Sequence, residues 1–448
     1  MTPDTIMWTY ALAPDVELRR TGQTAVLRTA AGQTRIEGIA EIDALDLLAG
    51  NGSTEEQIQI RMRSSEPGCD APARCAMLLD RLDRRGLLAR TLSSSGRRLA
   101  SCVPLRPRPD DLPEHLPQGA LRLSPHAAAR SEADLMVLDV PGAWAKMVIH
   151  ERDLLALLHD LAANTSVDEI TAKLPAYPIP VVLTMMDWCG LLDRGNNQAW
   201  THHDLLFHAR TRGGYARGLR GKVAAKEDDG AAPQSNDRFH GARRISLTKP
   251  DRDRMLAKDP PYVLVAERRR SIRRQGSTPL TVAQLSEFLF RTLHERDGRR
   301  PHPSGGGRYP LQSYVAVHRC TGVEAGLYAY DPARHELIAV SEPGPALDRL
   351  LTDAAGAAAV DAVPQILIVL AAQYARTQTS YPDIGYSLIL KEIGAVFQAA
   401  MMAAAAMGLG SCALGAGNSM LFSELTGVDP LVESSVGELM LGSLDHVT

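Results

Sequence analysis

The stretch that decides the fold runs from residue 385 to residue 418 and reads GYSLILKEIGAVFQAAMMAAAAMGLGSCALGAGN. Its first part predicts one long helix, from about Ile384 to Met407, that is rich in alanine and glycine. Small residues let another backbone approach closely, so the helix fits either a tightly packed dimer interface or an ordinary core. Residues 408–418 follow as a glycine-rich turn that could point backbone N–H groups at a cofactor.

Strand-like runs surround this helix in the C-terminal half of the chain. The segments SYVAVHRC (313–320) and PQILIVLAA (364–372) are strand-like, and they alternate with helical segments such as TVAQLSEFLFRTL (281–293). This mixture predicts an α+β fold with a buried, small-residue helix at its centre.

Two further patterns lie upstream of the long helix. Residues 268–273 form the cationic cluster RRRSIR, in which a hydroxyl stands between arginines that could grip a phosphate. Residues 300–310 read RPHPSGGGRYP, whose glycines would let the backbone approach a planar ligand. A solvated charge run and a surface turn are the plain alternatives. Neither GxGxxG in a βαβ unit nor GxxxxGK[ST] occurs, which disfavours a Rossmann site or a P-loop.

The N-terminal half contains a degenerate repeat. In each copy a β-rich segment precedes an apolar helix, a helix with a polar cap and a third helix ending in Gly-Leu-Leu. The caps are STEE (53–56) and TSVDE (165–169). The size of each copy predicts two tandem winged-helix-like domains, 1–110 and 119–200, followed by a linker or exposed segment, 201–250. Without a basic recognition face they are expected to bind a peptide rather than DNA.

The composition of the chain disfavours several classes of function. The chain has 448 residues, enough for several domains, and 49 Lys+Arg against 52 Asp+Glu leave a net charge of −3, which does not favour nucleic acid. The six cysteines form no C-x-x-C pair, so we expect neither a metal site nor a disulfide framework. The start lacks a basic leader, and no uninterrupted apolar run approaches the ~18 residues of a membrane span. We therefore expect a cytoplasmic protein without a membrane partner.

In this order and at these separations the patterns resemble the nitroreductase superfamily, and specifically its SagB-type, ThcOx-like peptide azoline dehydrogenases. The resemblance runs from about Trp200 to the C-terminus and rests on DPPYVLVAERRRSIRR, RPHPSGGGRYPLQSYVAV, GYSLILKEIGAVFQ and AMGLGSCALGAGN. The repeated N-terminal half is also similar to the family's tandem winged-helix region. The resemblance implies an FMN oxidoreductase domain over 251–448, acting as a homodimer to oxidise thiazolines or oxazolines in a precursor peptide. Leader and core peptide would be partners, and a cyclodehydratase complex is a further candidate.

The resemblance also assigns roles within the cofactor site. The flavin phosphate and ring edge would be held by Arg269, Ser271 and Arg273. The isoalloxazine would be covered from the partner protomer by Pro303, Ser304, Gly305 and Gly306. The flavin N5 would face the backbone at Leu414 and Gly415.

One departure from the family concerns catalysis. Peptide azoline dehydrogenases carry a Lys-Tyr pair ahead of the central helix, and here that run reads Thr379-Ser380-Tyr381. A serine hydroxyl cannot replace an amine as a general base near neutral pH. Tyr381 is therefore the main catalytic candidate, with Ser380 at the lysine position. Possible assisting groups are Tyr386, His302 and Lys391.

Two alternatives stay open because of this departure. The first is a flavoprotein that acts on a different modified peptide or amino acid. The second is a non-catalytic, peptide-binding scaffold. A further departure is Gln373, because related sequences commonly have a basic residue in this region.

Overall fold

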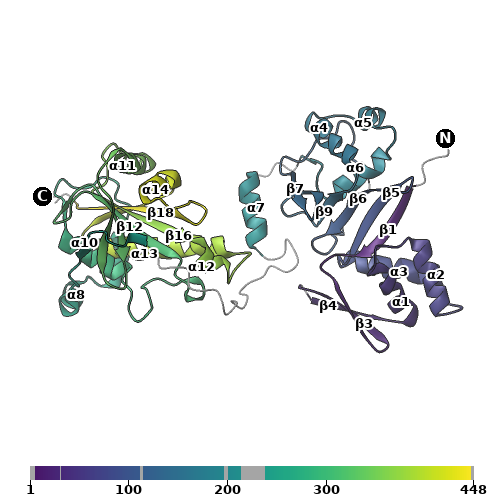
Figure 1. Cartoon of the computed structure of the whole chain (residues 1–448), viewed down its shortest axis with the longest axis horizontal. Coiled ribbons are helices and arrows are strands. Elements are labelled where there is room, and N and C mark those ends of the chain that lie inside the picture. Colours follow the sequence, from purple (N-terminus) through teal and green to yellow (C-terminus); the bar gives the residue numbers. More distant parts are fainter. Residues whose placement is uncertain are drawn as a thin grey trace. The chain divides into compact units, whose positions relative to one another are not determined.

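The computed structural model describes residues 6–30, 32–110, 112, 115–195, 200–212 and 238–444. The chain divides into two compact units, Met1–Leu219 and Arg220–Thr448, and each is described by itself. Both units combine helices with antiparallel sheets (Figure 1), so the predicted α+β class is confirmed.

The N-terminal unit contains the predicted repeat. The first copy consists of β2 (Glu17–Thr21), β3 (Thr24–Thr29), β4 (Gly32–Glu37), α1 (Ile39–Leu48), α2 (Glu55–Ser65) and α3 (Ala71–Arg84). The second consists of β7 (Ala128–Glu132), β8 (Leu135–Asp139), β9 (Ala145–Ile149), the 3-10 helix η1 (Arg152–Leu155), α4 (Ala156–Ala162), α5 (Val167–Lys173) and α6 (Ile179–Trp188). Each copy is thus a three-stranded meander followed by three α-helices.

The predicted polar caps are confirmed in both copies. Thr54 accepts a hydrogen bond from the backbone N–H of Gln57, whose side chain accepts one from the backbone N–H of Thr54. Ser166 and Glu169 form the same reciprocal pair at the start of α5. These bonds satisfy donors that the first turn of a helix leaves without intrahelical partners.

One sheet joins the two copies. β1 (Ile6–Leu12), β5 (Leu88–Ser94) and β6 (Arg97–Pro104) continue through β9 into β8 and β7, in the order β1-β5-β6-β9-β8-β7. The joint is the antiparallel pairing of β6 with β9. The segments predicted as two domains, 1–110 and 119–200, therefore share a sheet and fold as one unit. Their winged-helix character stays a prediction.

The C-terminal unit is built on a seven-stranded antiparallel sheet, in the order β10-β15-β14-β12-β16-β18-β17. Its strands are β10 (Arg244–Ser246), β12 (Leu311–Val317), β14 (Gly326–Asp331), β15 (Glu336–Ser341), β16 (Ile366–Gln373), β17 (Gly410–Leu414) and β18 (Glu433–Gly442). A separate two-stranded sheet pairs β11 (Leu280–Thr281) with β13 (Cys320–Thr321). β16 lies near the middle, and all its residues but the last are buried.

Helices cover both faces of this sheet (Figure 1). One core layer lies under α10 (Val282–Thr292) and α13 (Gly385–Ala406), and the other lies under α11 (Pro345–Ala357) and α14 (Ser419–Thr426). The described part of the unit also contains α8 (Arg252–Lys258), α9 (Tyr262–Arg268), α12 (Tyr374–Gln378) and the 3-10 turn η3 (Gly305–Gly307). α13 contacts α9, η3 and β17, and the predicted cofactor residues lie in or next to these three elements.

The long helix predicted from about Ile384 to Met407 is α13, which differs from the prediction by one residue at each end. Although Lys391 and Glu392 interrupt it, α13 is long and apolar enough to cross a membrane by length and composition. Ile389, Ile393 and Val396 recur at helical spacing and pack into the sheet's core, as in the core helix of a folded domain. Its role at a dimer interface stays a prediction.

The segment predicted as a linker, 201–250, is structured at both ends. α7 (His202–Thr211) lies near its start, and β10 near its end adds an edge strand to the C-terminal sheet. Residues 213–237 lie outside the described residues.

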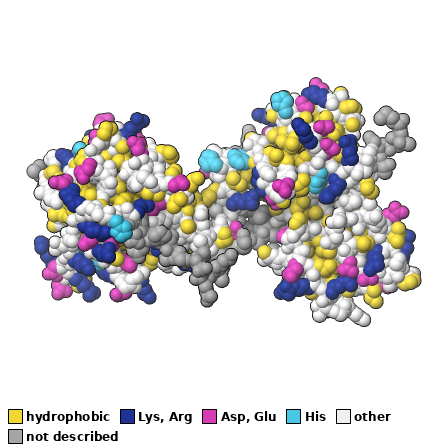
Figure 2. All heavy atoms as spheres, viewed as in Figure 1, with side chains coloured by type: hydrophobic (Ala, Val, Ile, Leu, Met, Phe, Trp, Pro, Cys, Tyr) yellow, Lys and Arg dark blue, Asp and Glu magenta, His cyan; other side chains and the backbone are white. Residues whose placement is uncertain are grey.

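On the face shown in Figure 2, acidic and basic side chains are interspersed, and neither charge gathers into one large patch.

Candidate functional site

The cationic segment that follows α9 is held beside β17. The backbone N–H of Ile272 donates to the carbonyl oxygen of Ser411 at 2.8 Å. The Ile272 side chain also packs on Gly410, where a Cβ would lie 2.9 Å from its Cγ2. Two groups that are far apart in sequence, the arginine cluster and the glycine-rich strand, are thereby brought together.

The side chains predicted to hold a phosphate are available for a ligand. Among the described residues no ion pair or hydrogen bond engages the side chains of Arg269, Ser271 or Arg273. Arg273 and Ser271 are exposed, and Arg269 is half-buried. Gly415 is also exposed, with no atom within 4 Å of the place where a Cβ would be. Two guanidinium groups, a hydroxyl and an open glycine turn fit the phosphate and ring of FMN.

A second cluster forms where the glycine loop, residues 303–309, meets the end of α12. Gly306 adopts a φ of +62°, and a Cβ there would lie 2.8 Å from the hydroxyl oxygen of Tyr381. Ser304 stabilises the loop, because its Oγ accepts the backbone N–H of Tyr309 at 2.8 Å. The structure thus brings the loop and the catalytic candidate together, while their roles stay predictions.

Ser380 and Tyr381 differ in accessibility. Ser380 is fully buried, and its Oγ accepts a hydrogen bond from Nη2 of Arg308 at 2.5 Å. In this conformation Ser380 joins α12 to the glycine loop and offers no exposed group to a substrate. Tyr381 is half-buried, so its hydroxyl remains the better placed of the two catalytic candidates.

The assisting candidates lie in different environments. His302 is buried, with its Nε2 3.4 Å from Oε1 of Glu392 on α13. Tyr386 and Lys391 are exposed on α13. α13 contacts both β17 and η3. The prediction that the loop covers the partner protomer's flavin stays a prediction.

Glu433 is a buried carboxylate at the centre of a hydrogen-bonded cluster, and no local sequence pattern predicted this cluster. It is 1% exposed, and its carboxylate accepts hydrogen bonds from Tyr314 at 2.6 Å and from Gln373 at 2.9 Å. Arg238 completes the cluster, with Nη2 2.9 Å from Oε1 of Glu433. Burial and the negative charge of Glu433 raise the pKa of Tyr314. A basic side chain therefore does lie beside Gln373, but it comes from the predicted linker rather than from the strand.

Glu438 is a second buried acid without a local sequence signal. It lies opposite Leu414 in the β17–β18 pairing, and a Cβ on Gly417 would overlap its carboxylate. Its Oε1 has no hydrogen-bond partner among the described residues. Burial raises the pKa of Glu438 to about 7, the backbone N–H of Asn418 opposes this shift, and the charge of Asp353 adds to it. The turn that follows Gly415 therefore packs against a carboxyl group whose pKa lies near neutral pH.

The pH dependence of stability is expected to differ between the protein and its Glu438→Gln variant. Below pH 4.5 the carboxyl is protonated in both the folded and the unfolded chain, so its titration does not change the free energy of unfolding there. Between pH 4.5 and about 7 only the unfolded chain ionises, so folding loses stability as the pH rises, by about 3 kcal/mol in all. Urea unfolding of the C-terminal unit at pH 5 and pH 8 measures this loss. Equal pH dependence in the two proteins would contradict it.

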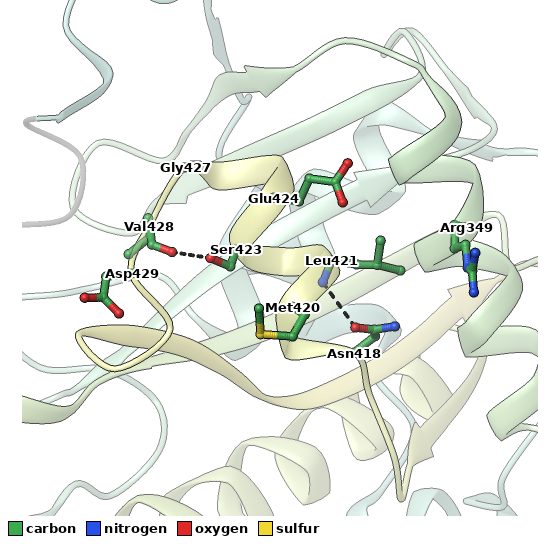
Figure 3. A pocket seen from close by; sticks show the side chains of 9 residues that line it. All are labelled: Arg349, Asn418, Met420, Leu421, Ser423, Glu424, Gly427, Val428 and Asp429. Atoms are coloured by element: carbon green, nitrogen blue, oxygen red, sulfur yellow. Dashed lines mark hydrogen bonds between the residues drawn. The ribbon is translucent and has the colours of Figure 1, made fainter.

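A pocket of about 750 Å³ lies against α14 (Figure 3). It is formed by residues of α14 and its flanking turns, with Arg349 of α11 at one side. Asn418 starts the helix by accepting the backbone N–H of Leu421 at 3.1 Å, and Ser423 donates to the carbonyl of Val428. None of the predicted catalytic or cofactor residues lines this pocket.

Known proteins match both units. A family model described as the nitroreductase family matches residues 266–443. A nitroreductase from Methanocaldococcus jannaschii is 36% identical over 155 residues, which cover 33% of this chain and 75% of that protein. The chain belongs to the nitroreductase family. The matched region includes every residue predicted for the cofactor and for catalysis.

A second family model matches part of the N-terminal unit. The model described as cyanobactin oxidase ThcOx matches residues 121–217, in the second repeat and α7. The resemblance to a ThcOx-like member of the superfamily is thereby confirmed.

The solved structures that match this chain also include nitroreductases. One from Ralstonia eutropha is 24% identical, covers 45% of this chain and 90% of its own, and has a TM-score of 0.37. A chain of the E. coli microcin synthetase McbBCD complex with truncated pro-MccB17 is 17% identical, covers 66% of this chain and 99% of its own, and has a TM-score of 0.36.

Proposed function

We propose that this nitroreductase is an FMN-dependent dehydrogenase of ribosomal peptide maturation, which oxidises thiazoline or oxazoline rings in a precursor peptide to thiazoles or oxazoles. The main observation behind this proposal is that one chain matches both the nitroreductase family and the cyanobactin oxidase family. The first match supports an oxidoreductase, and the second supports a peptide as its substrate. The unengaged arginines, in the segment whose Ile272 contacts β17, support the choice of FMN.

In this proposal the residues of the C-terminal unit bind the cofactor and handle one proton. The phosphate is held by Arg269, Ser271 and Arg273, and the backbone at Leu414 and Gly415 faces the reactive edge of the ring. FMN, when bound, supplies a two-electron acceptor. The phenolate form of Tyr381, packed against Gly306, would take the proton that leaves the azoline ring. Arg308 keeps α12 in place through Ser380.

The N-terminal unit is proposed to hold the leader peptide. Binding the leader raises the effective concentration of the core peptide at the oxidoreductase unit without any new contact to the ring. The proposal further includes a homodimer that completes each flavin site, a cyclodehydratase complex as a partner, and a cytoplasmic location.

A second candidate function is favoured by the burial of Ser380. The position of the family's lysine carries no amine and no exposed group, so removal of a proton from an azoline depends on Tyr381 alone. A flavoprotein that oxidises or reduces a different modified peptide or amino acid would not need that amine.

Two measurements on the purified protein separate these functions. The visible absorption spectrum and identification of released flavin test the cofactor, and mass spectrometry of an azoline peptide tests the loss of two hydrogen atoms. FMN together with that mass loss supports the dehydrogenase. FMN without it supports the second candidate. A colourless protein that cannot be reconstituted with FMN contradicts both and leaves a peptide-binding scaffold.

Replacing Gly306 with alanine is expected to slow peptide oxidation roughly 10- to 100-fold without loss of FMN, because displacing a reacting group by about 1 Å costs that much. The new methyl group would push on the Tyr381 hydroxyl, 2.8 Å from the Cβ position. Turnover and flavin content measure the two effects. Gly427→Ala is the matched control, because Gly427 has a similar φ of +68° and no atom within 4 Å of its Cβ position, and it lies outside the glycine loop and the proposed sites. Equal losses in both variants would show that backbone strain, not Tyr381, is responsible.

A further inference from the structure

A small pocket lies beside the glycine loop, and the proposed reaction assigns it no role. Its volume is about 200 Å³, and its lining includes Arg300, Arg376 and Glu295 together with Gly307 and Tyr309 of the loop. None of the residues proposed to hold FMN lines it. The pocket is therefore a second concave feature of the C-terminal unit, next to the loop that contacts Tyr381.

Arg300 is largely buried at this pocket, and no carboxylate of the described residues is hydrogen-bonded to it. Its side chain is 11% exposed, and the nearest recorded carboxylate oxygen, Oε2 of Glu295, lies 3.8 Å from its Nε, beyond hydrogen-bond distance. Nη1 donates to the carbonyl oxygen of Leu311 at 2.5 Å, and the guanidinium carbon lies 5.5 Å from the centroid of the Tyr309 ring. Nε makes no hydrogen bond among the described residues. Burial lowers the pKa of Arg300, although Glu295 opposes the shift.

Arg376 places a second cation at the same pocket. Its Nε donates to the carbonyl oxygen of Arg308 at 3.2 Å. Burial lowers the pKa of Arg376, and the charge of Arg308 adds to this effect, while Glu295 and Glu392 oppose it. Two guanidinium groups thus face one partly exposed carboxylate, Glu295, whose side chain is 30% exposed.

The other acidic residue of the pocket, Asp331, is engaged elsewhere. Its Oδ1 accepts the backbone N–H groups of Ala333 and Arg334, at 3.1 and 3.0 Å. Its Oδ2 lies 3.6 Å from Nη1 of Arg334, on the solvent side of the turn. The two carboxylates that line the pocket balance the two guanidinium groups in formal charge, but neither is hydrogen-bonded to them among the described residues. A largely buried guanidinium without a hydrogen-bonded counter-charge is costly.

We propose that this pocket binds a single carboxylate group, held by Arg300 and Arg376. A guanidinium group presents parallel N–H donors that match the two oxygens of a carboxylate. Liquid water occupies ≈ 30 Å³ per molecule, so the pocket has room for roughly six waters. A carboxylate on a short aliphatic chain fits such a space.

The source of the carboxylate is an acidic side chain of the peptide substrate, an assignment that rests on the proposed function. Gly307 and Tyr309 line the pocket and flank Arg308, whose guanidinium donates to Ser380. Gly306, in the same loop, contacts Tyr381. A carboxylate bound here would hold the peptide next to the loop that carries the proposed catalytic contact.

Binding of two blocked amino acids to the full-length protein tests the proposal. N-acetylglutamic acid amide carries one side-chain carboxylate, and N-acetylglutamine amide has the same shape without the charge. Saturation-transfer NMR titrations are expected to show that the blocked glutamate binds about tenfold more tightly, and that Arg376→Gln reduces this preference to about twofold or less. Arg376 is preferred to Arg300 for substitution because its guanidinium is less deeply buried, and thermal unfolding checks that the variant folds.

The control variant is Arg334→Gln, because Arg334 lies on the same turn but does not line the pocket. It is expected to keep the preference for the blocked glutamate. Equal affinities of the two compounds, or a preference that Arg376→Gln leaves unchanged, would overturn the proposal. Acetate as competitor distinguishes the sources: if acetate binds as tightly as the blocked glutamate, the site takes a free carboxylate rather than a side chain. These titrations need no flavin, so they can succeed or fail independently of the azoline oxidation assay.

Discussion

Replacing Gly86 with alanine is expected to destabilise the N-terminal unit by about 3–5 kcal/mol, the sum of backbone strain and overpacking. Gly86 follows α3 with a φ of +65°, and a Cβ there would overlap the carbonyl oxygen of Arg106. That oxygen belongs to the backbone and cannot rotate away. All four tryptophans, Trp8, Trp144, Trp188 and Trp200, lie in the N-terminal unit, so urea unfolding followed by tryptophan fluorescence measures this loss directly.

The repeat supplies a matched control for this prediction. Gly190 occupies the same place after α6, with a φ of +70°, but its Cβ would meet only the Cβ of Ala143 at an ordinary 3.6 Å. Gly190→Ala should therefore cost only the backbone strain, roughly 1–2 kcal/mol. Equal losses at the two sites would show that the contact with Arg106 contributes nothing.

Replacing Glu433 with alanine is expected to destabilise the C-terminal unit by about 3–5 kcal/mol, the usual cost of breaking a buried ion pair by removing one partner. The variant would leave Tyr314, Gln373 and Arg238 without their common acceptor. Because the C-terminal unit has no tryptophan, its unfolding is measured by far-ultraviolet circular dichroism and compared with the fluorescence transition of the N-terminal unit.

Glu336→Ala provides the comparison for Glu433. Its carboxylate pairs with Arg244 at 3.3 Å at the edge of the same sheet, where solvent screens the charges. This variant should cost less than about 1 kcal/mol. A loss at Glu433 no larger than that at Glu336 would mean that Arg238 and its neighbours find other partners.

Local patterns in the sequence determined several elements of the nitroreductase unit and of the repeat. α13 is predicted within one residue at each end because its helical pattern and the glycines after it lie within one continuous segment. The caps at Thr54 and Ser166 are predicted because a cap and its partner lie within one helical turn. The arginine cluster, the glycine loop and the turn at Gly415 are recognisable for the same reason, since each is a short run of residues with a fixed composition.

The tertiary structure decided which of these segments meet. Only strand pairing shows that β6 and β9 join the two repeats, because alternation of side chains does not specify a strand's partner. Burial of Ser380 against Arg308, of Glu433 against Arg238 and of Glu438 beneath Gly417 follows from contacts between residues far apart in sequence. The charge that a side chain carries and the partner that it finds depend on this burial. The sequence by itself therefore determined the family and the local elements, and the packing of strands and helices decided the environment of each site residue.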